Sequence, residues 1–180
     1  MIENTIVINQ SKYGHSAEYA NYLASILDVK IGKFKTNIDN YENIIFVCPI
    51  YGGNLYLLKK VVPILEKAKD KKVFMITVGM SNVDNPQIII QRNEILAHNI
   101  PEDLLNNITS FHLSSGIKFS KLQFKDKLIL SVIYKNSKKK DPETISAEAK
   151  KFIDNYNVNY TIDNEEKIDD IAEIIKSEIK

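Results

Sequence analysis

The sequence predicts a doubly wound α/β domain, in which helices cover both faces of a parallel β-sheet. Two observations predict this fold. Short, continuous apolar segments recur along the chain, as expected of strands that are buried on both faces, and segments with helical spacing of apolar residues alternate with them. The chain of 180 residues is 44% hydrophobic and carries 24 Lys and Arg against 23 Asp and Glu. It is therefore long enough to bury one core, and its composition excludes a disordered chain.

Five segments are expected to form the sheet. Four of them are rich in apolar or β-branched residues and stop at polar residues, glycine or proline, and the segment 29–34 is a weaker strand candidate. These segments are residues 5–9, 29–34, 44–48, 73–78 and 108–113. Right-handed crossovers between parallel strands leave few topologies for five such strands.

Helices are expected between the strands and after the last one. Ser16 suits an N-cap, and apolar residues follow it at helical spacing. Residues 55–69 are expected to be helical, with a kink or restart at Pro63.

Two further helices have recognisable starts. Asn85 and Pro86 suit the cap and first turn of a helix that runs to about His98. Asp163 and Glu166 have capping-box spacing before the apolar face of a C-terminal helix. No repeat or flexible linker interrupts the chain, so residues 1–180 are expected to form a single domain.

Residues 117–160 are expected to be an amphipathic helical segment inserted into that domain. Within it, residues 118–140 combine an apolar face with eight lysines, and a second helix is expected from Asp141-Pro142 to about Asn155. Two interpretations stay open for 118–140: a helix packed on the domain with its lysines in water, which is favoured, or contact with an anionic membrane.

Composition limits the function classes. A net charge of +1 excludes a strongly basic nucleic-acid module. The single cysteine, Cys48, cannot form an internal disulfide, so a location in the reducing cytoplasm is expected. If residues 118–140 contact a membrane, the expected location is the inner face of that membrane. No apolar run approaches the roughly 18 residues of a membrane span.

Ligands of open α/β sheets bind beyond the carboxyl ends of the strands. Three segments follow strands one, three and four and are the expected cofactor-binding loops. They contain Ser11, Lys12, Tyr13, Gly14, His15 and Ser16; then Pro49, Ile50, Tyr51, Gly52, Gly53 and Asn54; then Gly79, Met80, Ser81 and Asn82.

The first loop suits a phosphate. Ser11 and Ser16 supply hydroxyls, Gly14 lets the backbone approach an anion, and the following helix supplies free N–H groups. A plain strand-to-helix turn is equally compatible with this loop alone. In the second loop, Tyr51 beside Gly52-Gly53 can lie against a flat ligand, although it can also cover core. Together the three loops favour a planar ligand with one phosphate.

These residues carry a family resemblance. Ser11 to Ser16 is similar to the flavodoxin phosphate loop, Ser/Thr-x-Thr-Gly-x-Thr, and Pro49 to Gly53 resembles the flavodoxin loop whose aromatic residue stacks on the flavin. The match is nearest to the flavodoxin-domain subfamily that includes menaquinone-dependent protoporphyrinogen dehydrogenase. Three further segments resemble it: 18–20, 115–127 and 160–163.

The resemblance implies a five-stranded flavodoxin-like sheet of order 2-1-3-4-5 and FMN as cofactor. Residues 11–16 would then hold the phosphate, Tyr51 would stack on the ring, and Gly79 to Asn82 would border its pyrimidine edge. No catalytic acid or base is identified. The resemblance implies an oxidoreductase for electron or hydride transfer, extending to quinone-linked oxidation of an organic substrate such as a porphyrinogen.

Two alternatives stay open: an FMN electron carrier that docks on redox partner proteins, and a flavin-free interaction module of the same fold. The sequence also departs from the family pattern. Tyr13 replaces the usual Thr, the chain has no Trp, and Arg92 is the only arginine.

Other α/β classes lack their key residues. No arginine follows Cys48 in an anion loop, as a cysteine phosphatase would need. No aspartate follows the third strand, as a response-regulator receiver would need, and no glycine-rich dinucleotide or P-loop pattern occurs. His98 and His112 have no partners at ligand spacing, so no metal is expected.

Overall fold

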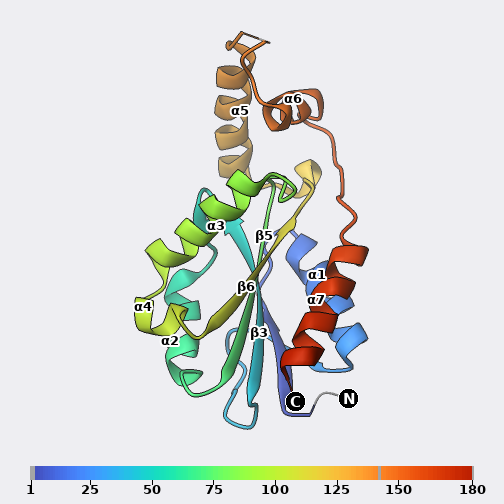
Figure 1. Cartoon of the computed structure of the whole chain (residues 1–180). Helices are drawn as coiled ribbons and strands as arrows, with labels where there is room; N and C mark the ends of the chain where they lie inside the picture. The colour runs from blue at the N-terminus through green and yellow to red at the C-terminus, as the bar shows by residue number, and fades with distance from the viewer. Residues whose placement is uncertain (1–2, 142, 180) are drawn as a thin grey trace.

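A computed structural model describes residues 3–141 and 143–179 (Figure 1). Within these residues the chain forms one sheet, with helices on both faces and two helices that extend from one end. The strands are β1 (Thr5–Asn9), β2 (Lys30–Gly32), β3 (Asn43–Tyr51), β4 (Asn54–Leu55), β5 (Lys72–Gly79) and β6 (Ile108–Ser114). The helices are α1 (His15–Leu27), α2 (Leu58–Lys67), α3 (Pro86–Asn99), α4 (Glu102–Leu105), α5 (Phe124–Lys138), α6 (Ala147–Asp154) and α7 (Glu165–Glu178), with a 3₁₀ turn at Phe119–Lys121.

The sheet confirms the predicted topology. Its parallel strands lie in the order β2-β1-β3-β5-β6, which is 2-1-3-4-5 when the five predicted strands are counted. The additional strand, β4, pairs antiparallel with the end of β3. All five loops at the carboxyl ends of the parallel strands therefore lie at one edge of the sheet.

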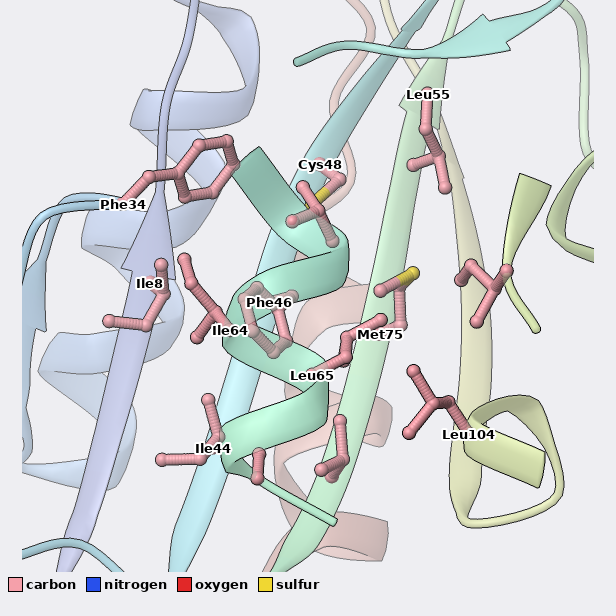
Figure 2. Close-up of a cluster of buried hydrophobic side chains, with 14 of the residues drawn as sticks. Ile8, Phe34, Ile44, Phe46, Cys48, Leu55, Ile64, Leu65, Met75 and Leu104 are labelled. Atoms are coloured by element: carbon pink, nitrogen blue, oxygen red, sulfur yellow. The ribbon is translucent and has the colours of Figure 1, made fainter. Parts of the chain in front are cut away.

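Side chains alternate along the strands and fill a core on each face. On β3, Ile44 and Phe46 face one cluster, whereas Ile45 and Val47 face the other. The first cluster includes apolar residues of α2, α3 and α4, and Figure 2 shows Phe46 and Met75 of the sheet close to Ile64 and Leu65 of α2. The second cluster is closed by α1 and α7. Both faces of the sheet are thus covered by apolar side chains and shielded from solvent, which explains why the strands are continuously apolar.

The first helix starts differently from the prediction. Its N-cap is Gly14, at φ 105°, and Ser16 lies inside the helix with no capping hydrogen bond from its side chain. The C-terminal helix is capped by Asn164 instead of Asp163, whose carboxylate accepts a hydrogen bond from the Glu165 N–H. In both helices the predicted cap, Ser16 or Asp163, lies within two residues of the observed cap.

The other helix predictions have mixed outcomes. Asn85 caps α3 by accepting a hydrogen bond from the Gln87 N–H at 3.0 Å, which confirms the predicted start. Pro63 lies inside α2 and does not end it. The helix expected from Asp141 begins at Ala147, after Ser146, and Pro142 lies outside the described residues.

Residues 118–159 form a projection, which we call the arm. Ile117 and Tyr160 pair as an isolated antiparallel bridge at its base, where the Tyr160 N–H donates to the Ile117 carbonyl at 2.9 Å. Beyond this bridge, α5 and α6 extend past the body of the domain (Figure 1). None of the side chains on α5 is fully buried, so the favoured prediction of a helix packed on the domain is wrong.

Candidate functional site

Asn9 shapes the first candidate loop. This buried residue ends β1, and its side-chain amide donates to the Val47 carbonyl at 2.6 Å and to the Ser16 carbonyl at 3.2 Å. The strand end, the neighbouring strand and the first turn of α1 are thereby joined. The Gly14 N–H donates to the Ser11 hydroxyl at 2.9 Å across the turn. The loop between Ser11 and Ser16 therefore has a fixed shape.

The start of α1 leaves polar groups without partners. The N–H groups of Ala17 and Glu18 donate to the Gly14 carbonyl, whereas those of His15 and Ser16 have no acceptor among the residues that the structure describes. The Ser16 side chain is 2% exposed, and its buried hydroxyl has no hydrogen-bond partner in the same residues. A buried hydroxyl and two free N–H groups are the donors that an oxyanion needs.

Lys118 adds a positive charge at this loop. Its Nζ atom lies 3.3 Å from the point that a β-carbon on Gly14 would occupy, and its ammonium group pairs with the Glu18 carboxylate. The side chain is only 17% exposed. Burial and the Lys118 charge lower the pKa of His15, which keeps its imidazole neutral at pH 7. Lys118 is not among the residues predicted for the site, because it lies 102 positions after Ser16 in the chain.

The side chains of Lys12 and Tyr13 turn away from this position and toward the arm. Lys12 Nζ lies 2.6 Å from Asp126 Oδ2 in the first turn of α5, and the Tyr13 hydroxyl donates to the same oxygen. These hydrogen bonds, Lys12 first, lower the pKa of Asp126. Of these two residues, only the backbone can face an anion in the first loop, and their side chains tie the loop to the arm.

Tyr51 lies at the end of a hairpin instead of in a free loop. Pro49 and Ile50 continue β3, which runs to Tyr51, and Asn54 opens β4, so the prediction that the strand ends before Pro49 is wrong. Pro49 is compatible with the strand, since its carbonyl still accepts a hydrogen bond, from the Tyr56 N–H at 2.9 Å. Gly52 and Gly53 form the two-residue turn, with φ values of 57° and 76°.

Three tyrosines meet beside this hairpin. The Tyr51 ring contacts Tyr13 edge-on, with centroids 5.7 Å apart, and Tyr56 in the same way at 5.2 Å. Tyr51 is half-buried, and burial raises its pKa to about 12, so its hydroxyl stays protonated. The contact between Tyr13 and Tyr51 brings the first and second predicted loops together, as sequence analysis expected of one sheet edge.

Arg92 holds the third predicted loop. Its guanidinium is buried under the end of β5 and donates to the carbonyls of Gly79 at 3.0 Å, Ser81 at 3.1 Å and Leu113 at 2.7 Å. Burial lowers its pKa to about 10, which still leaves it charged at pH 7. Ile50 lies beside Gly79 and links this loop to the second one. Met80 is exposed, and the Asn82 side chain accepts a hydrogen bond from the Asp84 N–H.

Cys48 has no chemical role at this edge. It lies on β3 within the core, and burial raises the pKa of its thiol to about 12. It is therefore protonated and inaccessible, which agrees with the expected inert thiol. No group of three or more His, Cys, Asp or Glu side chains that could hold a metal ion occurs within residues 3–141 and 143–179.

The comparison with protein families decides the classification. The flavodoxin domain family matches residues 6–144, more than half of the chain. The chain belongs to the flavodoxin domain family. The match includes the three predicted loops and α5, so this edge of the sheet lies within the flavodoxin domain.

Solved structures provide a weaker comparison. A flavodoxin, WrbA-like protein from Agrobacterium tumefaciens is 19% identical, with a TM-score of 0.38, over 58% of this chain and 89% of that chain. The Trp repressor binding protein from Bacillus subtilis is 13% identical, with a TM-score of 0.40, over 61% and 82%. A flavodoxin from the domain Archaea is 12% identical, with a TM-score of 0.37, over 61% and 83%. No curated protein matches the sequence. Classification therefore rests on the family match and on the sheet order.

Proposed function

We propose that this flavodoxin domain binds FMN at the carboxyl edge of its sheet and takes part in electron or hydride transfer. The observation that carries the proposal is the buried, unpartnered Ser16 hydroxyl at the start of α1. Leaving a hydroxyl buried without a partner costs about 1–3 kcal/mol. A phosphate oxygen bound at this loop would remove that cost.

The residues present fit the cofactor. The Ser16 hydroxyl and the His15 and Ser16 N–H groups would hold the phosphate, and Lys118 would offset its charge. Tyr51 would lie against the ring, while Gly79 to Ser81, held by Arg92, would border it. FMN supplies one- and two-electron redox chemistry, and the protein's role is to bind, orient and exclude water.

We extend the proposal to an enzyme that acts on an organic substrate, with quinone-linked oxidation of a compound such as a porphyrinogen as the specific hypothesis. The observation that favours an enzyme over a small electron carrier is the arm, whose first helical turn contacts Lys12 and Tyr13 of the first loop. An electron carrier needs no such appendage at its cofactor edge.

The first test is direct. The purified protein is incubated with FMN, desalted, and examined for a flavin absorbance spectrum, and its affinities for FMN and riboflavin are compared by flavin fluorescence. We expect retained FMN and weaker binding of riboflavin, which lacks the phosphate. Tyr51→Ala should weaken the binding of both FMN and riboflavin. Tyr41 is a half-buried tyrosine that precedes β3, and Tyr41→Ala should change neither affinity. A colourless protein with no measurable affinity for FMN would contradict the proposal and favour a flavin-free module.

A further inference from the structure

The outer face of α5 is apolar and exposed. Five of its large apolar side chains are between 46% and 75% exposed: Phe124, Leu128, Ile129, Val132 and Ile133. By helical spacing they cover one half of the helix circumference, with Lys125 among them. Single exposed apolar residues are ordinary, but a continuous set on one helix indicates an interaction surface. We call these five residues the apolar face of α5.

The opposite side of α5 is already covered within the arm. Tyr134 stacks on Tyr156, with ring centroids 4.0 Å apart and planes inclined by 10°. Phe119 and Phe152 contact the same Tyr156 ring edge-on. These four aromatic side chains join α5 to the region of α6. The apolar face of α5 therefore does not complete the internal packing of the arm.

Positive charge is concentrated around this face. Residues 118–140 contain eight lysines and one acidic residue, Asp126, whereas the whole chain has a net charge of only +1. Asp126 is already paired with Lys12. Lys125 and Lys135 lie, by helical spacing, on the same side of α5 as the apolar face, and Lys138, Lys139 and Lys140 follow at its end. The whole arm, residues 118–159, contains ten lysines and five acidic residues, a net charge of +5, which leaves −4 for the remainder of the chain.

We propose that α5 binds an anionic membrane surface through its apolar face, with the helix lying in the plane of the interface. This inference goes beyond FMN binding and does not require it. Charge complementarity selects the occupant: lysines interspersed among apolar side chains match a surface that offers anionic headgroups above an apolar layer. Within the described residues, no helix is long and apolar enough to cross a bilayer, so contact would be confined to the interface.

A lipid surface fits this face better than a protein partner. To gain the same attraction, a protein would have to present carboxylates at positions that match these lysines, whereas anionic headgroups rearrange laterally to meet them. The arm projects beyond the body, so α5 extends away from the sheet and its covering helices (Figure 1). Since Asp126 at the start of α5 holds Lys12 and Tyr13, binding would bring the cofactor edge close to the membrane.

The test is sedimentation of the full chain with vesicles. We expect binding to vesicles that contain phosphatidylglycerol, little binding to pure phosphatidylcholine, and loss of binding at high salt as the Debye length falls from about 10 Å at 0.1 M to about 3 Å at 1 M. Leu128→Ser with Val132→Ser should abolish binding. Lys135→Gln, Lys138→Gln and Lys139→Gln together should weaken it by on the order of a hundredfold.

Matched controls keep the outcome clear. Ile90→Ser with Ile174→Ser removes two similarly exposed apolar side chains from the body. Lys59→Gln with Lys60→Gln removes two exposed lysines from the body. Neither pair of substitutions should change binding to anionic vesicles. Circular dichroism checks that each variant is folded. Failure of the folded protein to bind anionic vesicles at low salt would overturn the proposal. So would self-association, seen by sedimentation velocity and lost in the Leu128 and Val132 variant, because a second copy would then cover the face.

Discussion

The ammonium group of Lys118 lies over Gly14, 3.3 Å from the point where a β-carbon on that glycine would stand. A residue from the base of the arm thus closes over the loop that connects β1 to α1. Its partner is the Glu18 carboxylate, one turn into the helix. This arrangement makes the charge at the proposed phosphate position dependent on a residue far away in the sequence.

Replacing Lys118 should weaken the binding of FMN but not the binding of riboflavin. Lys118→Gln is expected to weaken the affinity for FMN by about tenfold, because a charge-assisted hydrogen bond contributes roughly 1.5–3 kcal/mol before solvent screening reduces that contribution. Riboflavin affinity should not change, since it has no phosphate. Titration of flavin fluorescence measures both. Lys125→Gln, an exposed lysine of α5, is the control. Equal losses for the two ligands would show that Lys118 acts on folding and not on the phosphate.

Ser16→Ala should affect stability and affinity in opposite directions. The hydroxyl is buried without a partner, so its removal is expected to leave the free energy of unfolding unchanged or to raise it by about 1 kcal/mol. FMN affinity should fall about tenfold, because a donor to the phosphate is lost. Urea denaturation and flavin titration provide the two values. Ser25→Ala in the same helix should leave FMN affinity unchanged, and a clear loss of stability in Ser16→Ala would contradict the assigned role.

Arg92→Met should destabilise the domain. The change leaves the carbonyls of Gly79, Ser81 and Leu113 without their buried donor, and a loss of about 3 kcal/mol or more is expected from urea denaturation. Gln91→Met, on the exposed side of α3, should change stability by less than about 0.5 kcal/mol. If both variants have the same stability, the guanidinium is not what holds the third loop.

Gly116→Ala should loosen the base of the arm. A β-carbon at Gly116 would lie 1.9 Å from the Tyr160 carbonyl oxygen, so the backbone must separate. Amide exchange of the Tyr160 N–H, which donates to Ile117, should accelerate, and the arm should become more sensitive to proteolysis. Gly52→Ala makes a useful contrast, since no atom lies within 4 Å and only its positive φ opposes the change. Unchanged exchange at Tyr160 would contradict this assignment.

Stability should fall in mild acid. Burial, followed by the Arg92 charge, lowers the pKa of His112 to about 4, and burial also lowers the pKa of His15. Between about 6.5, the usual histidine pKa, and about 4, the unfolded chain binds protons that the folded chain does not, so the free energy of unfolding decreases as pH falls. One histidine contributes a slope of at most about 1.4 kcal/mol per pH unit. Denaturation at several pH values tests this, and His112→Gln should reduce the slope.

Much of the sheet could be predicted from sequence, because buried parallel strands leave continuous apolar segments and their order follows from few allowed crossovers. Local signals were weaker at strand and helix ends. Pro49 suggested the end of a strand, yet β3 continues to Tyr51 because the carbonyl of Pro49 and the β4 pairing maintain it. Ser16 suggested a cap, yet Gly14 takes that position, at a φ of 105° that glycine adopts readily, and the helix begins one residue before Ser16.

Residues that shape the site through long-range contacts were missed for a different reason. Arg92 and Lys118 act on loops 11 or more residues away, and nothing in their local sequence indicates it. Asn9 gave a usable signal, since a polar residue that ends a buried strand needs partners for its amide. The position of the arm also depends on tertiary contacts, so its amphipathic pattern alone could not decide between packing and projection.

The arm is attached to the body at three neighbouring places. They are the bridge of Ile117 with Tyr160, the ion pair of Lys118 with Glu18, and Asp126, which Lys12 and Tyr13 hold from the first loop. A tilt of α5 relative to the body would have to change these contacts. Because the Tyr13 ring also contacts Tyr51, the orientation of the arm and the packing of the aromatic cluster share one residue.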